Sequence, residues 1–216
     1  MYTSIKKAFR FLKRKTLFNN RSELVNFIIG SNEYETYLEI GCSKDKTFGS
    51  VLAKKKVGVD PQSGGTVRAT SDEFFKKNRE FFDIIFLDGL HHSVQLEKDV
   101  DNALKCLSAN GTIVIHDANP LTEEAQQVPR KSKGGIWNGD VWKTIVALRT
   151  RADIDLAVGA FDYGCAVLIP RNNTDLLILN KDISDLTYSD LDKNRKKWLR
   201  LKSPSKLSRF MRNESN

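Results

Sequence analysis

The chain has few cysteines and no long hydrophobic segment. Its 216 residues include three cysteines, Cys42, Cys106 and Cys165, which are far apart and lie in apolar or strand-like stretches. This usage argues against a disulfide framework and against a zinc site built from cysteines. No run of 18 or more apolar residues is present, and the N-terminus lacks the apolar core of a signal peptide. We therefore expect a cytoplasmic protein without a membrane-spanning helix.

The central part of the chain has no excess of positive charge, although the whole chain carries a net charge of +8. Residues 1–21 contain seven Lys or Arg and no acidic residue, while residues 195–216 contain eight Lys or Arg and one Glu. Each end thus contributes +7, which leaves −6 for residues 22–194. Because such a body would repel a phosphate backbone, nucleic acid is not expected as the substrate.

The two basic ends are expected to flank one α/β domain. Apolar residues at helical spacing from Ser4 to Phe18 predict a basic amphipathic helix within residues 1–20. Such a helix either packs on its own domain or a partner, or binds the inner face of a membrane peripherally. Residues 21–175 are the predicted domain, and residues 176–216 a basic, partly helical extension. Assembly into a homo-oligomer stays open.

Strands and helices alternate through the predicted domain, as in a parallel sheet covered on both faces. The expected strands are residues 37–40, 56–59, 82–87 and 112–115, with a weak strand at 66–69, and helices are expected from Ser71, which would cap its helix, and across 96–107 and 140–150. Residues 154–161 and 165–170 are two further strands whose short connection demands an antiparallel hairpin, since a parallel crossover needs a dozen or more residues.

Four residues at the ends of these strands are expected to share one rim. Gly41, Asp60, Asp88 and Asp117 each follow a predicted parallel strand, and open parallel sheets bind ligands at the carboxyl ends of their strands. Gly41 permits a tight turn, and Asp60, 19 residues later, could accept hydrogen bonds from a ribose. The second and third glycines of a dinucleotide fingerprint are missing after Gly41, which disfavours an NAD-dependent oxidoreductase.

The motifs in their order resemble those of class I S-adenosylmethionine (SAM)-dependent methyltransferases, and more narrowly a bacterial O-methyltransferase subgroup associated with polysaccharide and natural-product modification. The resemblance covers about residues 34–170 and rests on YLEIG at 37–41, VGVDP at 57–61, TSDEFF at 70–75, FDIIFLDGLH at 82–91 and GTIVIHD at 111–117. It implies a Rossmann-like, seven-stranded, mostly parallel sheet with the last strand antiparallel and helices on both faces.

The resemblance also implies where the cofactor binds. Glu39 and Gly41 would line the methionine part of SAM, and Cys42 and Ser43 belong to the same cofactor-binding turn. Asp60 would hold the ribose hydroxyls. Ser71 or Asp72 would meet the adenine, and Asp88 would lie beneath the sulfonium and the acceptor.

The acceptor hydroxyl must lose a proton, and all three histidines lie next to the acidic strand ends. His91 is our first choice for the general base because it closely follows Asp88, and the pair His116-Asp117 is the rival. Alternatively, Mg²⁺ or Mn²⁺ bound by Asp88 and Asp117 would lower the pKa of the hydroxyl. Metal-dependent relatives place Asp-Asp or Asp-Asn after this strand, whereas here Ala118 follows Asp117.

The resemblance thus implies a SAM-dependent O-methyltransferase that acts on a hydroxyl of a sugar, a glycan or a related small molecule. Two alternatives remain at this stage. One is the NAD-dependent oxidoreductase, and the other is a non-catalytic Rossmann module whose basic ends bind a membrane or an acidic partner.

Overall fold

The computed structural model of the protein describes residues 17–131 and 134–212. The amphipathic helix predicted from Ser4 lies almost entirely outside these residues. Leu17 and Phe18 are described and are not helical. Phe18 is fully buried and packs against the rings of Phe27 and Phe161.

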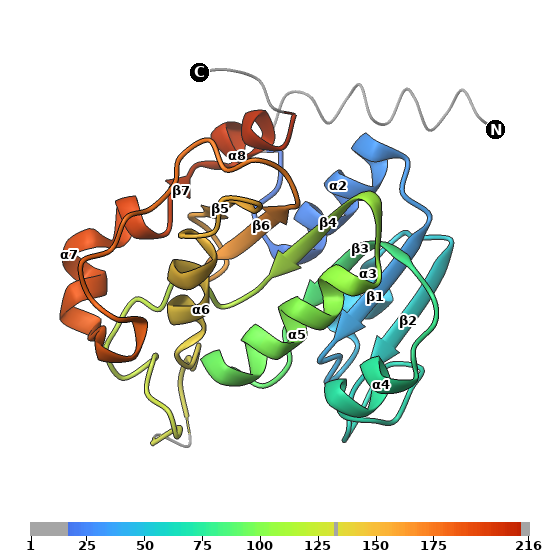
Figure 1. The fold of residues 1–216 in the computed structure, drawn as a ribbon. Coiled ribbons are helices and arrows are strands. Elements are labelled where there is room, and N and C mark those ends of the chain that lie inside the picture. The colour runs from blue at the N-terminus through green and yellow to red at the C-terminus, as the bar shows by residue number, and fades with distance from the viewer. Residues whose placement is uncertain (1–16, 132–133, 213–216) are drawn as a thin grey trace.

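A seven-stranded sheet forms the centre of the molecule (Figure 1). Its spatial order is β2-β1-β3-β4-β6-β5-β7, with strands β1 (Thr36–Ile40), β2 (Lys55–Val59), β3 (Phe82–Leu87), β4 (Leu107–Ile115), β5 (Asp155–Gly159), β6 (Cys165–Ile169) and β7 (Leu201–Lys202). β6 runs antiparallel to both of its neighbours, and every other pair is parallel. The Rossmann-like, mostly parallel sheet and the β5–β6 hairpin are therefore confirmed.

Helices cover both faces of the sheet because its buried strands alternate their side chains between two cores. In β3, Ile84 and Phe86 belong to one core, while Ile85 and Leu87 belong to the other. The first core packs against α2 (Arg21–Asn32), α3 (Lys46–Ser50) and α8 (Pro204–Met211). The second packs against α4 (Ser71–Lys77), α5 (Ser93–Lys105), α6 (Val141–Leu148), the short 3₁₀ helix η2 (Ile183–Asp185) and α7 (Tyr188–Trp198).

The strand expected at residues 66–69 does not form. Val67 makes a single bridge to Val59, because Gly64 and Gly65, both with positive φ, fold the segment into a turn. The amides of Thr66 and Val67 both bond to the carbonyl of Gly58 rather than to a ladder of partners. The seventh strand is instead β7, which extends the opposite edge of the sheet by pairing with β5.

Two local predictions were also wrong. Thr70, and not Ser71, caps α4, where it forms a reciprocal capping box with Glu73. The turn expected at Asn110-Gly111 is part of β4, in which Asn110 adopts a left-handed conformation (φ 63°) and the pairing with β3 shifts register. β4 consequently begins earlier than expected, at Leu107, a residue that the pattern had assigned to the preceding helix.

The C-terminal segment is built into the sheet and its core. α8 contacts β5 and β7, and its Leu207 and Phe210 join the core that also contains Phe18 and α2. Among the described residues, no helix has the length and apolar character needed to cross a membrane.

The packing of α8 yields a stability prediction. Leu207 is fully buried, so Leu207→Ala should lower the free energy of unfolding by about 2–5 kcal/mol, the usual effect of truncating a buried leucine. Arg209→Ala, on the exposed side of the same helix, should change it by less than about 0.5 kcal/mol. Urea denaturation measures both values, and equal effects would show that α8 does not contribute to the core.

Candidate functional site

A cavity of about 950 Å³ opens at the carboxyl edge of the sheet. It lies where the strand order reverses, since the chain leaves β1 toward β2 on one side and β3 lies on the other. Its lining includes all eight residues predicted to bind the cofactor, namely Glu39, Gly41, Cys42, Ser43, Asp60, Ser71, Asp72 and Asp88. His91 and Asp117 line the same cavity, so cofactor-side and acceptor-side candidates share one space.

Gly41 allows two strand ends to approach each other closely. Its φ is +90°, and a Cβ atom at this position would lie 2.1 Å from the carbonyl oxygen of Asp88. The glycine is therefore required for contact between the β1 and β3 loops, as well as for the turn itself. This contact holds Asp88 next to the predicted cofactor-binding turn.

The carboxylate of Asp60 organises the loops around it. One oxygen accepts hydrogen bonds from the amides of Gln62 and Ser63, and the other accepts one from Ser43, each at 2.8 Å. Although partial burial acts to raise it, these backbone hydrogen bonds lower the pKa of Asp60. The second oxygen keeps a free lone pair among its described contacts, so it can accept a further hydrogen bond from a ligand hydroxyl.

The far end of the cavity is polar. Gln95, which the sequence analysis had not selected, donates to the hydroxyl of Ser71 (3.3 Å) and to the carboxylate of Asp72 (3.0 Å). These two residues begin α4, directly after its cap. Their positions are thereby held between α4 and α5.

Glu39 is the most buried acidic group of the predicted cofactor site, with 1% exposure. It accepts a hydrogen bond from the hydroxyl of Tyr37. Burial raises the pKa of Glu39 to about 8, even though the hydrogen bond from Tyr37 acts to lower it. Glu39 is therefore mostly protonated at neutral pH unless a bound cation stabilises its ionised form.

The acceptor end of the cavity contains three carboxylates, from Asp88, Asp117 and Asp162, of which the sequence analysis had selected the first two. Asp162 lies in the β5–β6 hairpin, and its φ of 44° is left-handed. Arg21, the first residue of α2, bridges this group: its Nη1 donates to Asp88 at 2.9 Å, and its Nε lies 3.2 Å from Asp162. Arg21 is the main functional candidate that sequence reasoning missed.

The two selected histidines differ in their access to the cavity. His91 lines it, whereas the side chain of His116 is 2% exposed and does not. The ring of His116 donates through Nε2 to the carbonyl oxygen of Asp162 at 2.8 Å. Burial acts to lower its pKa, but hydrogen bonds with Asp117, Asp162 and Asp88 raise the pKa of His116 to about 12.

His91 lies against the same carboxylates from the cavity side. Its Nε2 is 3.4 Å from Asp88 and 3.2 Å from Asp117. Burial again acts to lower the pKa, but the hydrogen bond with Asp88 and the charge of Asp117 raise the pKa of His91. Burial acts to raise the pKa of Asp88, but its hydrogen bonds with His116 and His91 lower it.

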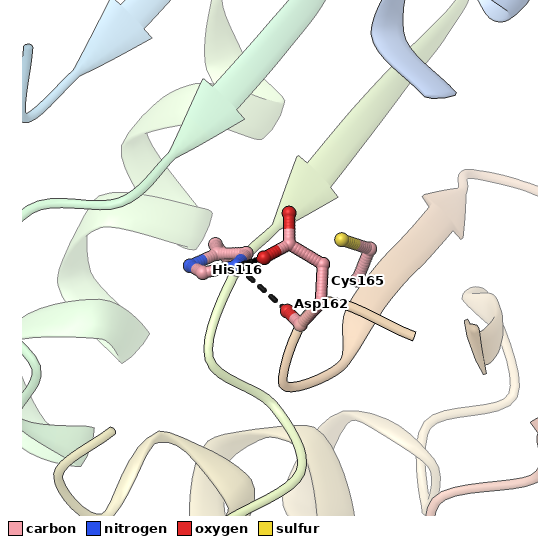
Figure 2. A group of neighbouring side chains, drawn as sticks. All are labelled: His116, Asp162 and Cys165. Carbon is pink, nitrogen blue, oxygen red and sulfur yellow. Dashed lines mark hydrogen bonds and ion pairs between the residues drawn. The ribbon is translucent and has the colours of Figure 1, made fainter. Parts of the chain in front are cut away.

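A second cluster lies behind this one and consists of His116, Asp162 and Cys165 (Figure 2). The Nε2 of His116 is occupied by the carbonyl of Asp162. Burial raises the pKa of Cys165 to about 12, so its thiol stays protonated. The donors of this second cluster therefore position His116 and do not offer a set of ligands to an ion.

Comparisons with known proteins find methyltransferases, both in a family model and among solved structures of similar fold. A family model described as a methyltransferase domain matches residues 23–118. The SAH-bound methyltransferase PaMTH1 of Podospora anserina is 19% identical and superposes with a TM-score of 0.52 over 70% of this chain and 77% of that chain. The SAM-bound O-methyltransferase TomG of Streptomyces achromogenes, involved in tomaymycin synthesis, is 12% identical, with a TM-score of 0.50 over 70% and 79%. No curated protein matches the chain. Residues 23–118 thus match a methyltransferase domain, and the fold is similar to that of methyltransferases solved with SAM or SAH.

The burial of Glu39 generates a prediction about stability and pH. Because its folded pKa of about 8 exceeds the value of about 4.3 in an unfolded chain, the folded state holds a proton that the unfolded state loses between these pH values. Relative to the Glu39→Gln variant, the wild-type protein should therefore lose stability across that window. The difference in unfolding free energy, variant minus wild type, should therefore grow from about pH 4.3 to 8.

Urea denaturation at several pH values measures this difference. Glu97→Gln, at an exposed position of α5, serves as the matched control and should show no such trend. A pH-independent difference for Glu39→Gln would mean that Glu39 is ionised in the folded protein.

Proposed function

We propose that the protein is a SAM-dependent O-methyltransferase that methylates a hydroxyl group of a sugar, a glycan or a related small molecule. The observation that carries the proposal is the continuity of one cavity, which connects the Asp60 turn to the carboxylates and His91 at the acceptor end. A nucleoside and an acceptor hydroxyl can therefore meet in one space.

The residues present fit the cofactor. Asp60 has an oxygen available to a ribose hydroxyl, and Ser71 and Asp72 offer hydrogen-bonding groups at the far end of the cavity. Glu39 could stabilise the positive amino group of the methionine part in its ionised form. When bound, SAM supplies a methyl group on a positively charged sulfur. The carboxylate of Asp88 supports this assignment, since it places negative charge between the two halves of the cavity.

The acceptor end has the chemistry needed to remove a hydroxyl proton. Of the three histidines, all of which are described, His91 alone lines the cavity. It either takes the proton itself or helps to hold a divalent cation that lowers the pKa of the hydroxyl. His116 is buried behind Asp88, so we assign it a positioning role.

The proposed acceptor class has support of its own. It is supported by the resemblance of the strand-end motifs to bacterial glycan-modifying and natural-product enzymes and by the hydroxyl-methylating activity that the name of TomG states. Residues 1–16 carry six Lys or Arg and no acidic residue, and such a segment would favour an anionic membrane surface where glycans are assembled.

Cofactor binding tests the first part of the proposal. Calorimetric titration should show that SAM and SAH bind with one site per chain and that NAD does not. Asp60→Asn should weaken SAM binding about 10- to 100-fold, because a hydrogen bond to a charged group contributes about 1.5–3 kcal/mol. Asp101→Asn, at an exposed position of α5, is the control and should bind SAM normally. Binding of NAD in preference to SAM would overturn the proposal.

His91 tests the acceptor end independently of the cofactor. His91→Ala should lower methyl transfer to extracted cell glycans at least 100-fold, the usual contribution of a positioned acid–base group, while SAM affinity stays within twofold. The release of SAH measures turnover, and His92→Ala, the neighbouring histidine outside the cavity, should retain activity. Full activity of His91→Ala would show that His91 has no part in the reaction.

A further inference from the structure

Three large aliphatic side chains are exposed around His91, at the acceptor end of the cavity. Leu90, which lines the cavity, is 61% exposed, Val94 is 59% exposed and Ile136 is 53% exposed. Single exposed hydrophobic side chains are common on protein surfaces, but a group of them beside a cavity marks a place where a ligand or a partner binds. We call these three side chains the aliphatic rim.

The two segments that present the aliphatic rim are held against each other. Gly139 has a φ of 62°, and a Cβ atom at its position would lie 1.7 Å from the carbonyl oxygen of His91, so the two backbones touch. Asp140 accepts hydrogen bonds from the amide (2.6 Å) and the hydroxyl (2.8 Å) of Ser93, the first residue of α5. The side chains next to these contacts are therefore presented by a fixed backbone.

Trp137 fixes the position of the neighbouring Ile136. Its carbonyl oxygen lies 3.0 Å from Nδ1 of His91, and its ring stacks on the ring of His91 with the centroids 5.1 Å apart. Its Nε1 donates to the carbonyl oxygen of Gln127 at 2.7 Å, and the guanidinium of Arg130 lies 5.7 Å from its ring. The indole is thus partly covered, and the apolar surface that is most exposed at this end of the cavity is aliphatic.

The mouth of the cavity has a different character at the cofactor end. Among the described residues that line the cavity and are exposed, Leu90 is the only one with a large hydrophobic side chain. Apart from Pro61, the others are polar or charged, and they lie between the end of β1 and the start of α4 in the chain. A bound nucleoside therefore does not account for the aliphatic rim, which belongs to the acceptor end.

A sugar alone is a poor match for this surface. Its hydroxyl groups form hydrogen bonds with water, and aliphatic side chains offer nothing to replace them. An aliphatic chain, in contrast, gains up to about fourfold in affinity for each CH₂ group that it buries. Because the carboxylates of Asp88 and Asp117 lie inside the cavity, the polarity of the site orients an amphiphile with its polar group inward and its chain over the rim.

The size and the place of the aliphatic rim favour a ligand over a second copy of the chain. Stable protein interfaces bury about 800 Å² per partner and use about 20–30 residues on each side, far more than three side chains provide. Leu90 belongs both to the rim and to the lining of the cavity. A molecule that fills the acceptor end and extends outward therefore passes over the rim.

We propose that the acceptor is a glycolipid whose hydroxyl-bearing head group enters the cavity beside His91 and whose aliphatic chain lies on Leu90, Val94 and Ile136. This inference rests on the proposed function, and it narrows the acceptor class from glycans in general to those attached to an aliphatic chain.

Alkyl glucosides test the proposal because their head group stays the same while the chain grows. The full chain would be titrated with methyl, butyl, hexyl and octyl β-glucoside below their micelle-forming concentrations, both with and without SAH, and ligand-observed NMR would measure the affinities. We expect octyl glucoside to bind at least about 30-fold more tightly than methyl glucoside, since each CH₂ group placed on the rim contributes a factor of about two to four.

Substitutions in the aliphatic rim locate the bound chain. Leu90→Ser and Ile136→Ser replace exposed side chains, so both variants should fold. Each should weaken the binding of octyl glucoside about threefold, and the double variant should weaken it about tenfold, with the binding of methyl glucoside unchanged. Leu52→Ser is the matched control, because Leu52 is 77% exposed and precedes β2 at the opposite edge of the sheet. It should keep the full dependence on chain length.

Two results would overturn the glycolipid proposal, namely an affinity that does not rise with chain length and a rise that is equal in the wild type and in the double variant. In either case, vesicles of phosphatidylcholine and analytical ultracentrifugation would identify the true occupant of the rim. Loss of vesicle binding in the double variant would indicate a bilayer, and loss of a dimer would indicate a second copy. Failure to bind SAH would overturn the methyltransferase proposal instead, while the titrations without SAH would still decide what the rim binds.

Discussion

The repulsion among three nearly buried carboxylates is the constraint on which the rest of the site depends. Asp88, Asp117 and Asp162 come from β3, β4 and the β5–β6 hairpin, and their side chains are only 8–15% exposed. Burying such charges is costly unless each is paired, and removing one partner of a buried pair typically costs about 3–5 kcal/mol. Arg21, His91 and His116 supply the opposing charge. The first turn of α2, the segment around Trp137 and the hairpin are consequently held at the same edge of the sheet.

These ion pairs explain why α2 begins with a positively charged residue, although the N-terminal end of a helix disfavours positive charge. Arg21 is the first residue of α2, and the positive end of a helix dipole repels a guanidinium. The contacts with Asp88 and Asp162 compensate for this repulsion. The same contacts fix Asp88 beside the Gly41 turn. The β1 and β3 loops therefore connect the cofactor half of the cavity to the charge cluster, which consists of Arg21, Asp88, His91, His116, Asp117 and Asp162.

The carboxyl edge of the sheet was predictable from the sequence, because short apolar runs that end in Gly41, Asp60, Asp88 and Asp117 define the strand ends directly. The rest was not. Arg21 lies 67 residues from Asp88, and no local pattern indicates a contact over such a distance. Asp162 belongs to a hairpin whose function in the site depends on the antiparallel pairing of β6, and β7 is too short, at two residues, to produce an alternating pattern. The capping box at Thr70 and Glu73 follows a local sequence pattern and was predictable, although the sequence analysis expected Ser71 as the cap.

The central claim is that the cofactor-binding turn and the charge cluster serve one reaction in one cavity. A crystal structure of the protein with SAH tests it most directly. The account predicts that the ribose hydroxyls bind Asp60 and that the sulfur lies next to Asp88, with its open side toward His91. A nucleoside bound outside this cavity, or bound in reverse with its adenine against His91, would contradict the account.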